Sequence, residues 1–205
     1  MKGLPAEILV ATRNVGKIRE IKALLQDLPI DVLSLADVAD TPEVVEDGTT
    51  FEKNALKKAR AMAEATGMTV IADDSGLCID ALDGRPGVLS ARYGGEGITD
   101  EEKCIRVLDE MREVRDAERT ARFVCVLAMV TSEGEERLFR GVCEGRITRE
   151  LRGTAGFGYD PIFYHEQSDC TFAQMDRDRK NLVSHRGAAL REFAAYLQAQ
   201  AGTGD

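Results

Sequence analysis

Tryptophan is absent from this 205-residue chain and aromatic residues make up only 5% of it, so aliphatic side chains have to fill most of the core. The hydrophobic fraction of 43% is ordinary for a globular protein and sufficient for that purpose. No apolar run approaches the roughly 20 residues of a membrane-spanning helix, and the first residues lack the long apolar stretch of a signal peptide. We therefore expect a cytoplasmic protein that does not bind membranes.

Histidine is scarce, and closely paired cysteines and an excess of basic charge are lacking. Neither of the two histidines has a metal-binding spacing, and none of the five cysteines forms a C-x-x-C pair, so neither a zinc site nor a disulfide framework is indicated. The formal net charge is -9, whereas proteins that bind nucleic-acid polymers usually present a basic face. A small anionic ligand, held by a few Lys and Arg residues and a metal, fits this composition better.

The apolar pattern predicts alternating strands and helices. Strands are expected at 8–11, 30–35, 69–72, 123–130 and 138–147, with a further apolar stretch at 77–82 and a hairpin turn at Gly134. Helices are expected from Val15 to Pro29, from a Thr49–Glu52 capping box to Gly67, from a Thr99–Glu102 capping box with Ile105, Leu108 and Met111 inward, and from Ser184. This order predicts an α/β fold with a mixed sheet, because a hairpin excludes a purely parallel one. No linker divides the chain, so residues 1–205 are expected to form one domain with two lobes around a cleft.

Four polar segments lie at the ends of apolar elements, where α/β proteins usually bind ligands. The first comprises Thr12, Arg13, Asn14, Val15, Gly16 and Lys17. A tight turn between a strand and a helix supplies backbone N–H groups and the positive end of the helix dipole, which together favour phosphate. It is not a Walker A motif, because Ile18 follows Lys17, and an ordinary turn with a surface lysine is the alternative.

The second segment is Asp73-Asp74-Ser75-Gly76, placed directly after a buried strand. Adjacent strand residues point to opposite faces, so one of the two carboxylates is expected to line a cleft. Mg²⁺ prefers oxygen ligands and binds through one or two carboxylates plus substrate phosphate, which favours a magnesium site here. A solvated acidic turn is the alternative.

The third and fourth segments carry groups suited to a nucleotide. In the third, Phe157, Gly158, Tyr159 and Asp160 combine a flexible backbone, two rings able to stack on a base, and a hydrogen-bond acceptor. In the fourth, Lys180, His185 and Arg186 place three donors near a helix start. An aromatic-pinned turn and a solvated helix terminus are the respective alternatives. Together the four segments supply what metal-assisted attack on a nucleotide polyphosphate requires.

The motifs ATRNVGK, TFEKNALKKA, IADDSGL, PGVLSARY, GFGYDPIF and SHRGAAL, in this order, resemble the Ham1/inosine-triphosphatase family, which includes bacterial dITP/XTP pyrophosphatases. The resemblance extends from residue 8 to about residue 197. It implies an elongated mixed-sheet α/β fold with two lobes around a central cleft, a homodimer, and Mg²⁺-dependent hydrolysis of ITP, dITP and XTP to the monophosphate and pyrophosphate. Such an activity keeps deaminated purine nucleotides out of DNA and RNA.

The resemblance also implies roles for residues. Residues 12–17 match the triphosphate-binding turn, Asp74 the proton acceptor and metal ligand, and Ser75 a substrate contact. Residues 157–160, Lys180, His185 and Arg186 match nucleotide-binding positions. Glu46 is taken as the second metal ligand, in a register open by one residue. Arg13 stands where the family often has glycine, so its backbone should not need a conformation reserved for glycine.

The mechanism expected from these residues is attack by water, with Asp74 or Asp73 as the base and with Lys17 and Lys180 stabilising the phosphates. Arg186, His185 or a backbone N–H would donate to the 6-oxygen of the base and disfavour the amino group of adenine. Two rivals remain open: a Maf-like pyrophosphatase with other base preferences, and a non-catalytic nucleotide-binding protein. The incomplete Walker pattern disfavours a P-loop ATPase.

Overall fold

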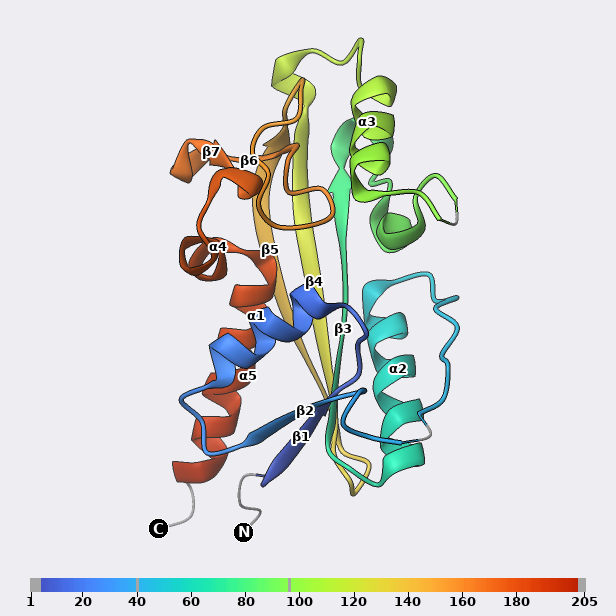
Figure 1. Cartoon of the computed structure of the whole chain (residues 1–205), viewed down its shortest axis with the longest axis vertical. Helices are drawn as coiled ribbons and strands as arrows, with labels where there is room; N and C mark the ends of the chain where they lie inside the picture. The colour runs from blue at the N-terminus through green and yellow to red at the C-terminus, as the bar shows by residue number, and fades with distance from the viewer. Residues whose placement is uncertain (1–4, 40, 96, 203–205) are drawn as a thin grey trace. The chain divides into compact units, whose positions relative to one another are not determined.

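The computed structural model describes residues 5–39, 41–95 and 97–202, and these form an α/β fold (Figure 1). The strands are β1 Glu7–Val10, β2 Asp31–Ser34, β3 Val70–Ile79, β4 Thr120–Val130, β5 Glu136–Ile147, β6 Phe163–His165 and β7 Cys170–Thr171. The α-helices are α1 Val15–Leu25, α2 Phe51–Thr66, α3 Asp100–Glu110, α4 Arg177–Val183 and α5 His185–Gly202. Short 3₁₀ segments lie at Asp80–Leu82, Gly87–Arg92, Asp116–Glu118, Glu166–Ser168 and Phe172–Gln174.

All seven strands join one sheet in the order β2-β1-β3-β4-β5-β6-β7. β1 is parallel to both β2 and β3, whereas β6 is antiparallel to β5 and β7. Gly134, with a φ of 85°, lies in the hairpin between β4 and β5. The predicted mixed sheet is therefore confirmed.

The chain divides into two compact units, each assembled from separate segments. The first contains the described residues within 1–74, 125–141 and 186–205, and the second contains those within 75–124 and 142–185. The expectation of one domain over residues 1–205 stays a prediction, as does the expected cleft.

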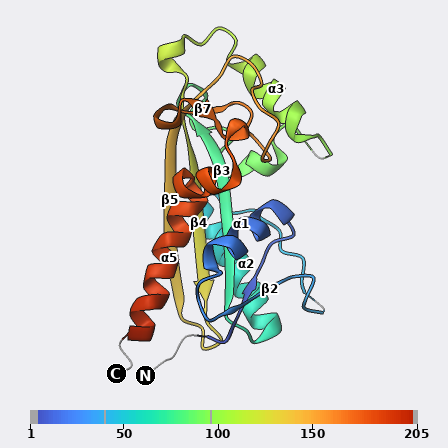
Figure 2. The ribbon, with the colours of Figure 1, turned by 60° about the vertical axis from the view of Figure 1, so that its left-hand side comes forward.

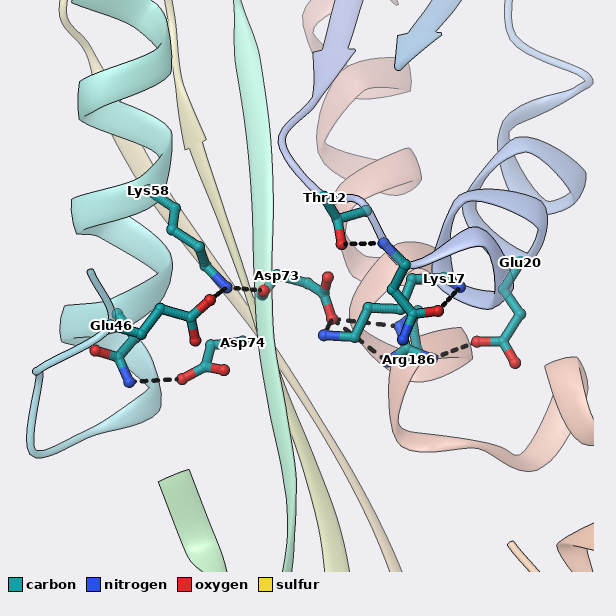
Figure 3. Close-up of polar contacts among 10 residues, drawn as sticks. Thr12, Lys17, Glu20, Glu46, Lys58, Asp73, Asp74 and Arg186 are labelled. Atoms are coloured by element: carbon teal, nitrogen blue, oxygen red, sulfur yellow. Dashed lines mark hydrogen bonds and ion pairs between the residues drawn. The ribbon is translucent and has the colours of Figure 1, made fainter. Parts of the chain in front are cut away.

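The core of the first unit lies between its strands and the helices α1 and α5. Ile8 and Val10 of β1, Ile21 and Leu25 of α1, and Phe193 of α5 belong to one buried cluster. The rings of Phe139 and Phe193 lie 5.2 Å apart, and Figure 2 shows α5 running beside β4 and β5. α2 lies on the other side of β3 (Figure 3), where it buries Ala55, Ala59 and Met62. Helices therefore cover both faces of these strands, as nearly continuous apolar runs predict.

The second unit has a core rich in aromatic rings. Phe123, Phe163 and Phe172 pack against one another with ring centroids 4.6–5.8 Å apart. α3 packs Cys104, Val107 and Met111 against this core. The Thr99–Glu102 capping box is present as predicted, and Leu108 and Met111 pack against the core as predicted, but Ile105 is 44% exposed. Cys104 and Val107 are buried in its place.

Three expectations about elements need correction. The strand expected at 69–72 does not end before Asp73, because β3 continues unbroken to Ile79, and this excludes the alternative of a solvated acidic turn. α2 is capped by Thr50, whose side chain accepts from the Lys53 N–H, and not by the predicted Thr49. α4, β6 and β7 were not expected at all. β6 and β7 are only three and two residues long, too short to show an alternation of their own.

Candidate functional site in the first unit and a nucleotide loop in the second

The turn between β1 and α1 has the predicted form. Asn14 caps α1, and its side chain accepts from the Lys17 N–H at 3.2 Å. The Thr12 hydroxyl accepts from the Asn14 N–H, also at 3.2 Å. The first turn of α1 has no acidic residue, so no carboxylate of its own offsets the positive end of the helix dipole. Arg13 is exposed and is not among the described non-glycine residues with positive φ, so its backbone does not need a conformation reserved for glycine, as expected.

Asp73 and Asp74 lie within β3, and their carboxylates point to opposite sides of the strand (Figure 3). Asp73 faces α1 and α5, and its Oδ2 lies 2.8 Å from Lys17 Nζ and 3.3 Å from Arg186 Nη2. Arg186 also pairs with Glu20 of α1. This ionic cluster joins β3 to both helices of its face, and it holds the ammonium of Lys17 beside the turn of residues 12–17.

The charges of this cluster determine its ionisation. Burial raises the pKa of the Asp73 carboxyl, but Lys17, Arg186 and Lys58 outweigh burial and hold that pKa well below 3.8. Burial lowers the pKa of Arg186, and Asp73 and Glu20 more than compensate, so that pKa is raised. Asp73 is therefore a carboxylate at every physiological pH, ion-paired with Lys17 and Arg186.

Asp74 has a different environment on the α2 side. Asn54 Nδ2 donates to Asp74 Oδ2 at 3.0 Å, and Glu46 contributes a second carboxylate nearby. Burial raises the pKa of Asp74, Lys58 and Asn54 oppose that shift, and the negative charge of Glu46 adds to it, so the pKa lies above 3.8. A carboxyl group with a raised pKa is a stronger base than an ordinary one.

Lys58 links the two sides of this site. Its ammonium donates to Glu46 Oε1 at 3.0 Å and to the backbone carbonyl of Asp73 at 2.8 Å. It therefore compensates part of the negative charge where Glu46 and Asp74 approach each other.

The donor set fits a magnesium ion that keeps part of its hydration shell. Within the described residues no three His, Cys, Asp or Glu side chains gather as a metal cage. Glu46 and Asp74 would supply two oxygen ligands, and water and phosphate would complete the shell, as is usual for Mg²⁺.

In the second unit, the structure brings three predicted nucleotide-binding residues together. Asp160 Oδ2 accepts from the Phe157 N–H at 2.9 Å and from Lys180 Nζ at 2.7 Å. The Lys180 ammonium also lies 4.5 Å from the centroid of the Phe157 ring, a cation–π contact. Lys180 and Asp160 thus form a nearly buried pair that supports one face of this partly exposed ring.

The rest of this loop is held by α3 and the core. Asp100 accepts from the Gly158 N–H at 2.7 Å, and the Cys104 thiol lies 3.4 Å from the Gly158 carbonyl. Tyr159, expected to stack on a base, is only 4% exposed, and its hydroxyl donates to the Ser90 carbonyl at 2.9 Å. Phe157 is therefore the ring of this loop that is placed to meet a ligand.

Ser75 and His185 stand where the chain passes between the units. Ser75 follows Asp74 in β3 and is partly exposed. The His185 ring is buried and stacks on Phe123, with centroids 4.6 Å apart and planes 11° apart.

Comparison with known proteins now gives the family. The model of the Ham1 family matches residues 8–196. The chain belongs to the Ham1 family. The Ham1 protein from Coxiella burnetii has a TM-score of 0.87 and 42% identity, with 94% of this chain and 98% of that chain covered. The Ham1 protein from Staphylococcus aureus has a TM-score of 0.85 and 40% identity, covering 95% and 99%.

Named relatives of this Ham1 chain share one description. The dITP/XTP pyrophosphatase of Geobacter sulfurreducens is 52% identical over 190 residues, which cover 93% of this chain and 96% of the relative. The dITP/XTP pyrophosphatase of Bacillus subtilis is 47% identical over 193 residues, covering 94% and 98%.

Two residues that contact the predicted site residues were not themselves predicted from the sequence: Asn54, which bonds to Asp74, and Lys58, which pairs with Glu46. They lie four positions apart on α2, so both project from one face of that helix. The available signal was Asn54 itself, a polar residue beside Ala55 on the apolar side of the predicted helix. A buried amide usually has a specific partner, and here that partner is Asp74.

Proposed function

We propose that this chain is a Mg²⁺-dependent nucleoside-triphosphate pyrophosphatase that acts on dITP, XTP and ITP. One water is consumed, the anhydride between the α- and β-phosphates is broken, and the nucleoside monophosphate and pyrophosphate leave. The observation that carries this proposal is the different environment of the two carboxylates in β3: Asp73 forms an ion pair with Lys17, and Asp74 faces Glu46. Membership of the Ham1 family and the names of the relatives support the substrate class.

Asp74 is the residue we assign to the attacking water. Its raised pKa makes it the better base of the two neighbours, since Asp73 is held as an ion-paired carboxylate. Asp74 would orient the water and take up its proton as the phosphorus–oxygen bond forms. Mg²⁺, when bound by Asp74 and Glu46, would supply positive charge that neutralises the polyphosphate.

The turn of residues 12–17 would bind the phosphates through its backbone N–H groups, with Arg13 and Lys17 adding positive charge. Substrate phosphate would then compete with Asp73 for the Lys17 ammonium. Because Arg186 remains bound to Asp73 and Glu20, the cluster keeps its shape when Lys17 turns toward the ligand.

The nucleotide base would stack on Phe157, whose other face is supported by Lys180 and Asp160. Hypoxanthine and xanthine carry an oxygen at the 6-position, where adenine carries an amino group. A donor such as His185, Arg186 or a backbone N–H would pair with the oxygen and leave the amino group of adenine unpaired. Each buried polar group left unpaired costs about 1–3 kcal/mol, so a few such contacts give large selectivity.

A cytoplasmic homodimer belongs to the same proposal, with a nucleotide as its small-molecule partner. The structure describes all five cysteines, and none of them forms a disulfide. Within the described residues, no helix has the length and apolar character needed to cross a membrane. Light scattering coupled to size-exclusion chromatography would measure the number of chains in the assembly.

Pyrophosphate release from dITP, XTP, ITP, ATP, GTP, dTTP and UTP, with Mg²⁺ and with EDTA, tests the proposed activity. We expect release from the first three only and only with Mg²⁺. Preference for dTTP or UTP would favour the Maf-like alternative, and nucleotide binding without pyrophosphate release would favour a non-catalytic protein. Equal kcat/KM for ITP and ATP would refute the base-selection scheme.

A further inference from the structure

Asn54, in the first turn of α2, connects the loop that carries Glu46 to the carboxylate of Asp74. Its side chain is fully buried. Asn54 Oδ1 accepts from the Gly48 N–H at 2.7 Å, and Asn54 Nδ2 donates to Asp74 Oδ2 at 3.0 Å. The two partners require opposite ends of the amide, because one is a donor and the other an acceptor. The orientation of this amide is therefore determined by the network.

Gly48 provides the space that this amide occupies. A Cβ added at Gly48 would lie 3.1 Å from Asn54 Cγ, closer still to Asn54 Oδ1, and 3.0 Å from Lys53 Cβ. The φ of Gly48 is not in the left-handed region, so its backbone conformation is open to other residues. Steric room for Asn54 is thus the reason for a glycine at this position.

The loop of Glu46 is held by α2 at two points. Lys58 contacts the Glu46 carboxylate at 3.0 Å, and Asn54 holds the backbone two residues further along, at Gly48. Asn54 also donates to Asp74. It differs from Lys58 in being neutral, so it orients the Asp74 carboxylate without cancelling its charge.

We propose that Asn54 is a positioning residue that sets the spacing of Glu46 and Asp74, and thereby the affinity of the protein for its divalent cation. Two carboxylates brought close together repel each other, so an unrestrained loop would move Glu46 away from Asp74. A neutral amide bonded to both sides opposes this separation before the cation arrives. The inference rests on the proposed function for the identity of the cation-binding pair.

The first test is Asn54→Ala, with Mg²⁺ binding to the nucleotide-free protein measured by calorimetry. Loss of such a supporting contact typically weakens metal affinity or activity by about 10- to 100-fold. We expect a loss of this size in Mg²⁺ affinity, and the same shift in the Mg²⁺ concentration that gives half-maximal turnover. At saturating Mg²⁺ we expect kcat to recover to near the wild-type value, because Asp74 itself is intact.

The matched test keeps Asn54 in the sequence but displaces its side chain. Gly48→Ala should weaken Mg²⁺ binding in the same direction, since the added Cβ occupies the position of the amide oxygen. In the double variant Gly48→Ala/Asn54→Ala the affinity should equal that of Asn54→Ala alone, because no amide remains to be displaced. Such non-additivity is the expected sign of two residues acting through one contact.

Thermal unfolding separates positioning from general stability. A lower Tm with unchanged Mg²⁺ affinity in both single variants would overturn the inference, and so would strictly additive effects in the double variant. If Asn54→Ala does not fold, Gly48→Ala carries the test alone, since every Asn54 atom is retained. Failure of the proposed function is a distinct result: the wild type would then release no pyrophosphate from dITP, while Mg²⁺ binding would still report on Asn54.

Discussion

Asp73 and Asp74 are consecutive residues of β3, yet Asp73 forms an ion pair with Lys17 at 2.8 Å and Asp74 accepts a hydrogen bond from the neutral amide of Asn54 at 3.0 Å. One residue is therefore embedded among cations, and the other stands beside a second carboxylate. The alternation of side chains along a strand is sufficient to produce this contrast.

Substitution of the more basic neighbour should abolish turnover without unfolding the protein. Asp74→Asn keeps the shape of the side chain and an oxygen that can accept from Asn54. General-base catalysis contributes typically about 10²- to 10⁴-fold, so pyrophosphate release from dITP should fall by at least about 100-fold. Because burial penalises the charged form of Asp74, Tm should stay at or above the wild-type value. Wild-type turnover in this variant would contradict the assignment.

Substitution of Asp73 should act mainly on stability and on its pH dependence. Asp73→Asn leaves the partly buried Lys17 and the buried Arg186 without their shared anion, which we expect to cost about 3–5 kcal/mol. The pKa of Asp73 is lower in the folded state than in the unfolded state, so the stabilisation that it provides is fully present above pH ~4 and is lost as the pH falls further.

Urea unfolding between pH 3 and pH 7 would measure both effects. The wild type should lose stability below pH ~4 more steeply than Asp73→Asn, because the variant lacks the carboxylate that must be protonated. Parallel pH profiles for the two proteins would show that Asp73 is not a major source of acid sensitivity.

Loss of the Phe157 ring should affect nucleotide binding more strongly than it affects the rate of the chemical step. Stacking of a base on an aromatic ring is worth about 1–3 kcal/mol, so Phe157→Ala should reduce kcat/KM for dITP by about 5- to 150-fold, mostly through KM. Phe157→Tyr keeps the stacking surface and serves as the control. An unchanged KM in Phe157→Ala would place the base elsewhere.

Arg119 of the second unit should be important for stability although it lies outside the proposed catalytic residues. Its guanidinium is almost completely buried and donates to the carbonyls of Ile147, Met111 and Thr148 at 2.9, 2.6 and 2.6 Å. The Met111 carbonyl also accepts from the Val114 N–H, so Arg119→Ala deprives mainly the carbonyls of Ile147 and Thr148 of a donor. Each buried carbonyl left without a donor costs about 1–3 kcal/mol, so the variant should lose at least about 2 kcal/mol.

Arg119→Lys is the matched control for this prediction, and it should recover only part of the loss. A lysine has one ammonium group, whereas the guanidinium reaches three carbonyls from three different nitrogens. Urea unfolding monitored by circular dichroism would give both values. A change below about 0.5 kcal/mol in Arg119→Ala would contradict this assignment.

The sequence predicts a helix or strand well where one local pattern determines its type and its ends. β4 is recognisable because apolar residues continue through Val130, and Gly67 ends α2 by adopting a φ of 68°. The capping residue of α2 was misplaced because Thr49 and Thr50 are chemically equivalent candidates. Only the backbone geometry shows that Thr50 accepts from the Lys53 N–H.

The error at β3 has a physical cause. Two adjacent carboxylates suggest a turn, since charge is rarely buried without partners. The partners of Asp73 come from Lys17 and Arg186, which are 56 and 113 positions away in the sequence. No local pattern contains such pairs, so the sequence could identify the acidic residues but not the continuation of the strand.

The composition of the first unit from three stretches of chain has a consequence for biosynthesis. β1 is the first strand to be synthesised. Its residues Ile8 and Val10 belong to the same buried cluster as Ala189, Leu190 and Phe193 of α5. During translation this cluster cannot form completely until residues 186–197 have left the ribosome. A nascent chain arrested at residue 185 should therefore expose apolar surface, to which chaperones bind.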